Sequence, residues 1–158
     1  DIMVNGVTYE LFDHSTGAAK PEFTFTITTT TVGEDMFGNE TTTVAANTFR
    51  MGALTTRGTR VITQSHSVSS STDILGNTNG SITEVEYGYI TSADGYLVFD
   101  KVTTTSTSSY EDLYGGQSTS STAVEIVQSY YFNSGLGHYA YDIMVNGVTY
   151  ELFDHSTG

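Results

Sequence analysis

The chain has 158 residues, 18 of them acidic and 5 basic, which gives a formal net charge of −13. This charge excludes binding to nucleic-acid phosphate, which depends on clustered Lys and Arg, and it disfavours anionic membrane surfaces. The absence of Cys excludes disulfides and thiolate metal sites, and no segment reaches the roughly 18 apolar residues of a membrane-spanning helix. A surface rich in carboxylates and Asn favours cations instead, and calcium is the cation that we expect.

The same 17-residue sequence stands at both ends of the chain. Residues 1–17 and 142–158 both read DIMVNGVTYELFDHSTG. Removing one 17-residue copy from 158 leaves 141 unique residues, which is enough to bury a core. We therefore expect residues 1–158 to form a single β domain in which one copy of the segment is redundant or pairs with a partner.

Most of the chain alternates polar and apolar side chains with a period of two residues. Phe23, Phe25 and Ile27, for example, alternate with Thr, a pattern typical of strands with one buried face. No stretch shows a sustained helical period. We therefore predict an all-β fold, with strands at 7–13, 22–32, 40–50, 59–70, 81–91, 96–108, 118–132, 138–145 and 148–154.

The links between these predicted strands contain turn-forming residues. They hold Gly38-Asn39, Arg57-Gly58, Asn79-Gly80, Asp94-Gly95, Gly115-Gly116, Ser134–Gly137 and Asn146-Gly147. Every link except 14–21 is short enough for a hairpin, which predicts an antiparallel up-and-down meander. Counting the duplicated strand once gives about eight strands, enough for a closed small barrel or a sandwich.

Three of the turns share one pattern: Asp, two apolar residues, Gly, and then Asn or Gly. They begin with Asp35, Met36, Phe37; with Asp73, Ile74, Leu75; and with Asp112, Leu113, Tyr114. Their spacing of 38 and then 39 residues matches a pair of hairpins, so all three tips should lie at one end of the sheet. The pattern predicts ordinary turn chemistry or, alternatively, exposed tips that contact a partner or hold cations. The flanking strand segments are nearly all Thr and Ser, which predicts a hydroxyl-rich end opposite an aromatic end; such an array could bind ice or glycan.

The C-terminal copy of the repeated segment is predicted to complete a hairpin that begins at His138. Asn146-Gly147 is a strong two-residue turn, and it pairs residues whose numbers sum to 293. This register places Tyr141 opposite Leu152 and continues an apolar face across the start of the copy without a linker. We expect the copy at 142–158 to be integral to the fold. The copy at 1–17 is expected to be looser or to face a partner, through the self-association residues Ile2, Val4, Val7, Tyr9 and Leu11.

The duplication has two explanations. The chain is one 141-residue period of a tandem array plus the start of the next, or it is a strand-exchanging, pilin-like fibre subunit completed by a copied strand. The uninterrupted apolar pattern favours the array.

The same predicted register brings together titratable side chains. His138 would oppose His155, and Asp142 would oppose Glu151, a set that could bind a divalent cation. The alternative is that both are solvated surface pairs. No nucleophile, zinc-protease, phosphate-loop or dinucleotide motif is present, so we do not expect an enzyme. A barrel could instead hold an apolar ligand or haem among Tyr130, Tyr131, Tyr139 and Tyr141.

Long identical repeats, acidity, the absence of Cys, and Thr/Ser-rich strands with Asp/Asn/Gly turns resemble the tandem-repeat modules of large bacterial surface adhesins. The resemblance covers the whole chain and is compositional, so it transfers no site residue. In that class the repeats are spacers, often rigidified by calcium, that hold a binding domain away from the cell. The resemblance implies a secreted or cell-surface, non-catalytic structural module of a stalk or fibre. Its partners would be copies of itself, with a host surface or glycan as a further partner.

Overall fold

The computed structural model describes all residues except 54–59, 92–96 and 156–158. The described strands are β1 (Ile2–Val4), β2 (Val7–Tyr9), β3 (Phe23–Glu34), β4 (Glu40–Met51), β5 (Arg60–Thr72), β6 (Thr78–Thr91), β7 (Leu97–Glu111), β8 (Gln117–Asn133), β9 (His138–Val145) and β10 (Val148–Tyr150). Two predicted turns, Arg57-Gly58 and Asp94-Gly95, lie outside the described residues, as do the predicted first residues of two strands, Thr59 and Tyr96.

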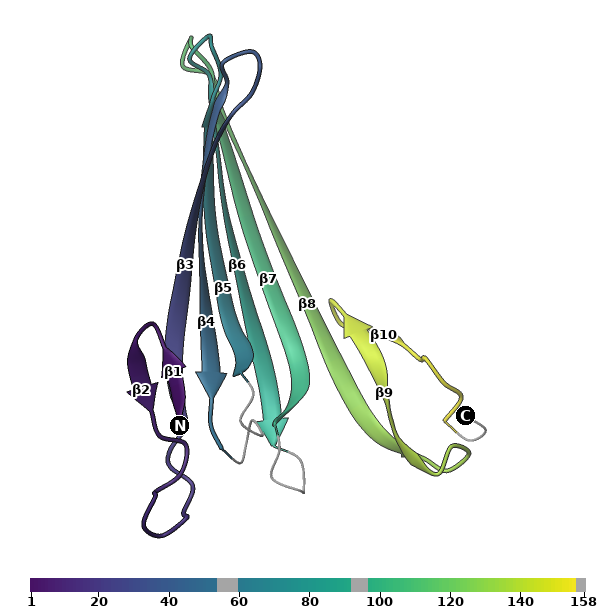
Figure 1. Ribbon diagram of the computed structural model, residues 1–158. Helices are drawn as coiled ribbons and strands as arrows, with labels where there is room; N and C mark the ends of the chain where they lie inside the picture. Colours follow the sequence, from purple (N-terminus) through teal and green to yellow (C-terminus); the bar gives the residue numbers. More distant parts are fainter. Residues whose placement is uncertain (54–59, 92–96, 156–158) are drawn as a thin grey trace.

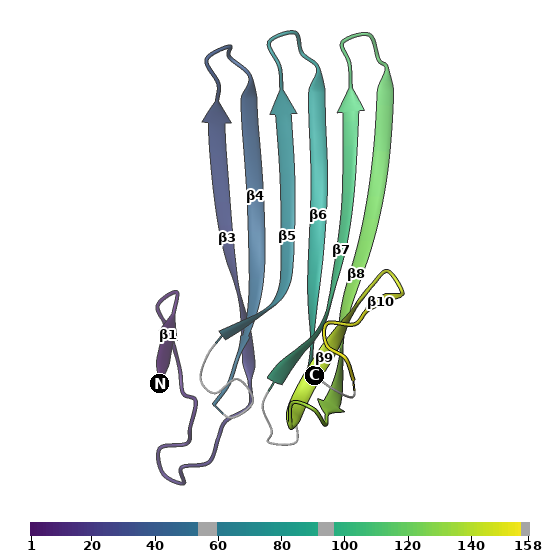
Figure 2. The same ribbon diagram turned by 90° about the vertical axis from the view of Figure 1, so that its right-hand side faces the viewer.

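The predicted all-β antiparallel meander is confirmed. Strands β3 to β10 form one eight-stranded sheet in which each strand pairs with the next along the chain, and β1 and β2 form a separate two-stranded sheet. Figure 2 shows the six long strands β3 to β8 side by side, with the three tips together at one end as predicted.

The sheet is open, so the predicted closed barrel is not observed. Its edge strands are β3 and β10, which do not pair with each other. Strand β10 has 3 residues and β3 has 12, so β10 offers too short an edge to close the sheet. Strands β9 and β10 also swing away from β3 at the lower end of the sheet (Figure 1).

Two local predictions need correction. The strands expected at 7–13 and 148–154 end at Tyr9 and Tyr150. After Tyr9 the chain folds back, because Asp13 accepts hydrogen bonds from the backbone N–H groups of Ser15 and Thr16. The turn expected at Asn79-Gly80 lies instead inside β6, since the chain already reverses at Asp73–Asn77.

The register divides the sheet into two chemically different faces. The face that we call the apolar face carries Phe23, Phe25, Phe49, Ile62, Tyr89, Phe99, Ile126, Tyr130 and Tyr141. The opposite face, the charged face, carries Glu34, Glu40, Glu84, Glu86, Glu111, Glu125 and Asp142. β-bulges at Thr48/Phe49 and Gly88/Tyr89 shift the strand pairing by one residue. After each shift Ile62 pairs with Phe49 and Phe99 pairs with Tyr89, so Ile62 and Phe99 lie on the apolar face.

Candidate self-association site

The two copies of the repeated segment form the same hairpin at opposite ends of the chain. In the first copy Ile2 pairs with Tyr9, and in the second Ile143 pairs with Tyr150. Both turns have an Asn in the left-handed region, with φ of 50° at Asn5 and 48° at Asn146. The tight Asn-Gly turn is thus a property of the segment itself and does not depend on its surroundings.

Each copy is also closed by the same side-chain contact. His14 Nε2 lies 2.8 Å from Asp1 Oδ1, and His155 Nε2 lies 2.8 Å from Asp142 Oδ2. The environments differ, because the Asp1 side chain is 37% exposed whereas the Asp142 side chain is 9% exposed. The second copy therefore buries its carboxylate in the sheet, and the first copy does not.

The second copy is attached to the chain that precedes it. The Asn146 N–H donates to the Glu125 carbonyl, and Asn146 Oδ1 accepts from the Glu125 N–H, both at 2.8 Å. Asn133, which is fully buried, donates through Nδ2 to the Asp154 carbonyl at 2.9 Å. The His155 ring lies 4.1 Å from the Tyr131 ring. These contacts fix the hairpin to β8.

The first copy is attached to the chain that follows it. The Tyr9 ring stacks on Phe23 of β3 with centroids 4.0 Å apart and planes 5° from parallel. The Lys20 N–H donates to the Leu11 carbonyl at 2.9 Å, and Lys20 also forms an ion pair with Glu10, which lowers the pKa of that carboxyl. These contacts fix the same sequence to β3.

The two sets of contacts are complementary. The groups that the first copy uses, at Tyr9, Glu10 and Leu11, correspond to Tyr150, Glu151 and Leu152 in the second copy. Tyr150 is 55% exposed and Leu152 is 47% exposed. The positions that contact the following chain in the first copy are therefore exposed to solvent in the second copy. The first set uses the Leu11 carbonyl and the second uses the Asp154 carbonyl, which lie at different positions of the segment. One copy of the segment can therefore make both sets of contacts at once.

Of the four residues that we predicted as a metal site, the structure brings Asp142 and His155 into contact, but not in the predicted register. The predicted register holds as far as Tyr150, where β10 ends, so Glu151 does not pair with Asp142. The partner of Asp142 is His155, which curls back toward β8, and His138 Nδ1 contacts the Tyr139 carbonyl at 3.0 Å. Within the described ranges, no group of three or more His, Asp or Glu side chains is arranged to hold a metal ion.

The three predicted tips form a connected row. Asn39 Oδ1 accepts from the Ile74 N–H at 3.2 Å, and Asn77 Oδ1 accepts from the Leu113 N–H at 2.9 Å, so each tip holds the next. The third tip has Gly116 where the first two have Asn. The six apolar tip residues are exposed: Met36, Phe37, Ile74, Leu75, Leu113 and Tyr114.

The tip carboxylates are occupied by their own turns. Asp73 Oδ1 accepts from the N–H groups of Leu75 and Asn77, and Asp73 Oδ2 accepts from Asn77 Nδ2. The Asn77 side chain is the main cause of the lowered pKa of Asp73. The Asn39 backbone N–H is the main cause for Asp35, which has the same arrangement. Calcium binding by these tips stays a prediction.

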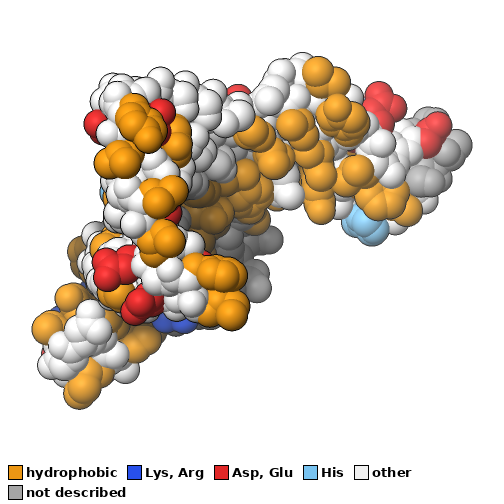
Figure 3. All heavy atoms as spheres, turned by 90° about the horizontal axis from the view of Figure 1, so that it is seen from above, with side chains coloured by type: hydrophobic (Ala, Val, Ile, Leu, Met, Phe, Trp, Pro, Cys, Tyr) orange, Lys and Arg blue, Asp and Glu red, His pale blue; other side chains and the backbone are white. Residues whose placement is uncertain are grey.

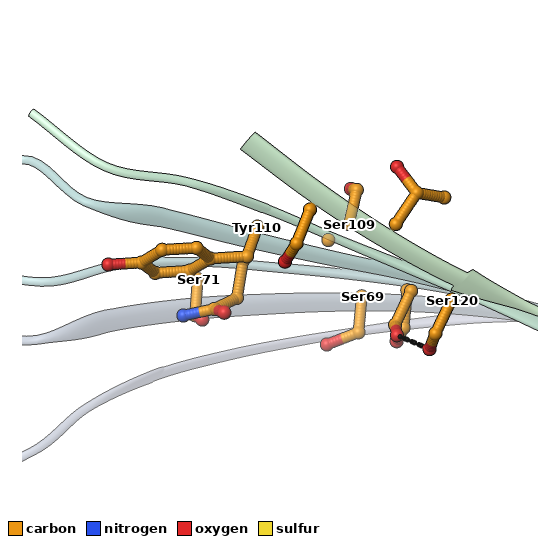
Figure 4. Close-up of a pocket in the computed structure, with 11 residues that line it drawn as sticks. Ser69, Ser71, Ser109, Tyr110 and Ser120 are labelled. Atoms are coloured by element: carbon orange, nitrogen blue, oxygen red, sulfur yellow. Dashed lines mark hydrogen bonds between the residues drawn. The ribbon is translucent and has the colours of Figure 1, made fainter. Parts of the chain in front are cut away.

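The apolar face becomes a hydroxyl-lined groove toward the tips. A cavity of about 360 Å³ is lined by Ser69, Ser71, Asn79, Ser81, Ser108, Tyr110, Ser118 and Ser120, together with Gly80, Ser109 and Thr119 (Figure 4). Hydroxyls pair across neighbouring strands, as at Ser108 and Ser120, whose oxygens are 2.8 Å apart. Sequence alone indicated this hydroxyl-rich end but not the groove, which depends on the curvature of the sheet.

The four tyrosines predicted to surround an apolar ligand do not face one space. Tyr130 and Tyr141 lie together on the apolar face with ring centroids 5.7 Å apart, and Tyr139 contacts Phe132 on that face. Tyr131 points to the opposite face, where it meets His155. Consecutive residues of a strand alternate in direction, so Tyr130 and Tyr131 cannot line one cavity.

Comparisons with protein-family models, with curated proteins and with solved structures returned no match. Among the residues that the structure describes, no helix has the length and hydropathy needed to cross a membrane.

Proposed function

We propose that the chain is one period of a non-catalytic, self-joining β-module, which builds an extended stalk or fibre at a bacterial cell surface. The observation that supports this proposal most directly is the complementarity of the two copies. In the described residues, the contacts of the second copy join it to β8 and the contacts of the first copy join it to β3. In an array with a 141-residue period, a single copy between two sheets would make both sets of contacts.

The proposal is tested with a chain that carries a second 141-residue period, so that it contains three copies of the segment. Hydrogen exchange should be slowest in the central copy, because only that copy has a sheet on both sides. The first and last copies serve as internal controls of identical sequence. Exchange in the central copy as fast as in the first copy would contradict the array.

The second candidate is the strand-exchanging subunit. It is supported by the seating of Ile143 and Met144 in β9, where they pair with Gln128 and Val127 of β8. A chain without residues 142–158 leaves this part of β8 unpaired, and an unpaired edge recruits another strand. Filaments of the truncated chain in electron micrographs would favour strand exchange. A truncated chain that stays monomeric would favour the array.

A glycan partner has one supporting observation, the groove that combines Ser and Thr hydroxyls with Asn79 and the Tyr110 ring. Hydroxyl and amide groups can hydrogen-bond to sugar hydroxyls, and an aromatic ring can pack against a sugar face. Binding to a glycan array that is lost in Tyr110→Ala and kept in Tyr114→Ala, at an exposed tip, would support this role. Equal binding by both variants would contradict it.

A further inference from the structure

The main sheet of this chain is a single layer, whereas a compact β domain has two packed layers. Its accessible surface is 10,232 Å², and the only buried hydrophobic side chains in the described residues are Met51 and Ala140. A compact monomer of 17.0 kDa exposes about 7,700 Å², roughly 2,500 Å² less. The single-layered sheet therefore leaves about this much more surface open to solvent than a compact chain of the same mass would.

The apolar face carries a band of aromatic side chains, most of them half-buried against their neighbours in the sheet. Phe25 stacks on Phe49 at 5.4 Å, Tyr89 meets Phe99 edge-on at 6.1 Å, and Tyr130 packs against Tyr141. These pairs belong to strands from β3 to β9, so the band crosses the sheet. Seen from the tip end, hydrophobic side chains gather in the recess between the β3 side of the molecule and the arm of β9 and β10 (Figure 3).

The distribution of charge identifies the kind of partner that this face fits. The register places seven strand carboxylates on the charged face and leaves the apolar face with Arg60, whose guanidinium lies over the Phe49 ring. Asp100 occupies a bulge between the two faces and, after burial and Tyr141, contributes to the raised pKa of Tyr130. A cationic partner would select the charged face. An aromatic surface with few charged groups is matched by another surface of the same kind.

We propose that two copies of this chain pack their apolar faces against each other and form a two-layer sandwich. In that arrangement the strand carboxylates of both chains point outward into water, so distance and salt screening reduce the repulsion between two chains of net charge −13. Packed sheets lie about 10 Å apart, a separation that aromatic and aliphatic side chains from two faces fill. Permanent dimers bury about 1,000–2,500 Å² per partner, which matches the excess area of this chain. The pairing does not depend on the tandem array, since one period carries the whole face.

The first test is the mass of the one-period chain in sedimentation equilibrium. The chain should sediment as two copies of 17.0 kDa. Phe25→Asp should make it monomeric, because a carboxylate would enter the apolar contact. Thr24→Asp, the next residue on the charged face, adds the same charge and should leave the dimer intact. A single-chain mass at every concentration would overturn the proposal.

The second test covers the case in which Phe25→Asp does not fold. The chain has no Cys, so one introduced thiol is unique. Val85→Cys places it on the apolar face at the centre of the sheet, and Glu84→Cys places it on the charged face. Alkylation of Cys at 85 should slow by about tenfold once nine-tenths of the chains are paired, while alkylation at 84 stays constant. A dimer in which both thiols react at the same rate would show that another surface forms the contact. Protection of Cys at 85 only in a two-period chain would show that the next repeat covers the face.

Discussion

At the scale of single residues, the tips depend on a carboxylate that must stay ionised. The pKa of Asp73 is lowered in the folded chain, so its contribution is complete above the unfolded pKa near 3.8 and is lost as the pH falls toward the folded pKa. Asp73→Asn should lower Tm by a few degrees at neutral pH and flatten the loss of Tm on acidification. Thermal unfolding from about pH 7 to about pH 2 measures both effects. Glu86→Gln removes the same charge at a strand position outside any turn and serves as the control.

The Asn residues that join the tips give a second prediction at this scale. Asn77→Ala removes its hydrogen bonds to Asp73 and to the Leu113 N–H. The loss should cost about 1 kcal/mol of unfolding free energy, which urea denaturation measures. Asn79→Ala, an exposed Asn two residues later in β6, is the control. Equal costs for the two variants would show that the row of tips does not stabilise the sheet.

At the scale of elements, the identical copies provide an unusual matched pair. His155→Ala should cost about 1–3 kcal/mol of unfolding free energy, because it leaves the buried Asp142 carboxylate without its partner. His14→Ala removes the same contact in the same sequence, but the Asp1 side chain is 37% exposed against 9% for Asp142, so the cost should be smaller. Chemical denaturation of both variants gives the comparison. A larger loss for His14→Ala would mean that the N-terminal copy is the one that holds the fold together.

Strand positions and the hairpin register could be predicted from the sequence, because period-two alternation and Asn-Gly turns are local signals. The ends of β2 and β10 could not. After Tyr9 the chain leaves the strand through the Asp13 turn together with the contact of Lys20 with Leu11, and after Tyr150 it leaves with His155 against Asp142. The predicted opposition of Asp142 and Glu151 is not observed for this reason, since it required the register to continue to Glu151, and metal binding itself stays a prediction.

At the scale of the whole molecule, alternation shows that each strand has an apolar face but not what covers that face. The alternating pattern predicts that Phe25 and Tyr89 are core residues, and a closed barrel is the simplest fold that buries them within one chain. Closure of a barrel also requires that the last strand is long enough to pair with the first strand of the sheet, and β10, with 3 residues, is too short. Which layer covers the apolar face is a property of the assembly, so no local pattern could predict it.

Coupling between periods is the remaining prediction at this scale. In the one-period chain Tyr150 is 55% exposed, so Tyr150→Ala should change the unfolding free energy by no more than about 0.5 kcal/mol. In a two-period chain the same residue belongs to the central copy and should stack on the next Phe23, as Tyr9 does now at 4.0 Å. There the substitution should cost about 1–3 kcal/mol and lower the ratio of van't Hoff to calorimetric enthalpy from about 1 to about 0.5, because the two periods then unfold independently. Tyr9→Ala in the one-period chain reports the cost of losing the same stack without an array. If Tyr150→Ala were equally neutral in both chains, neighbouring periods would be linked by the backbone alone, and the stalk would be a flexible string of modules.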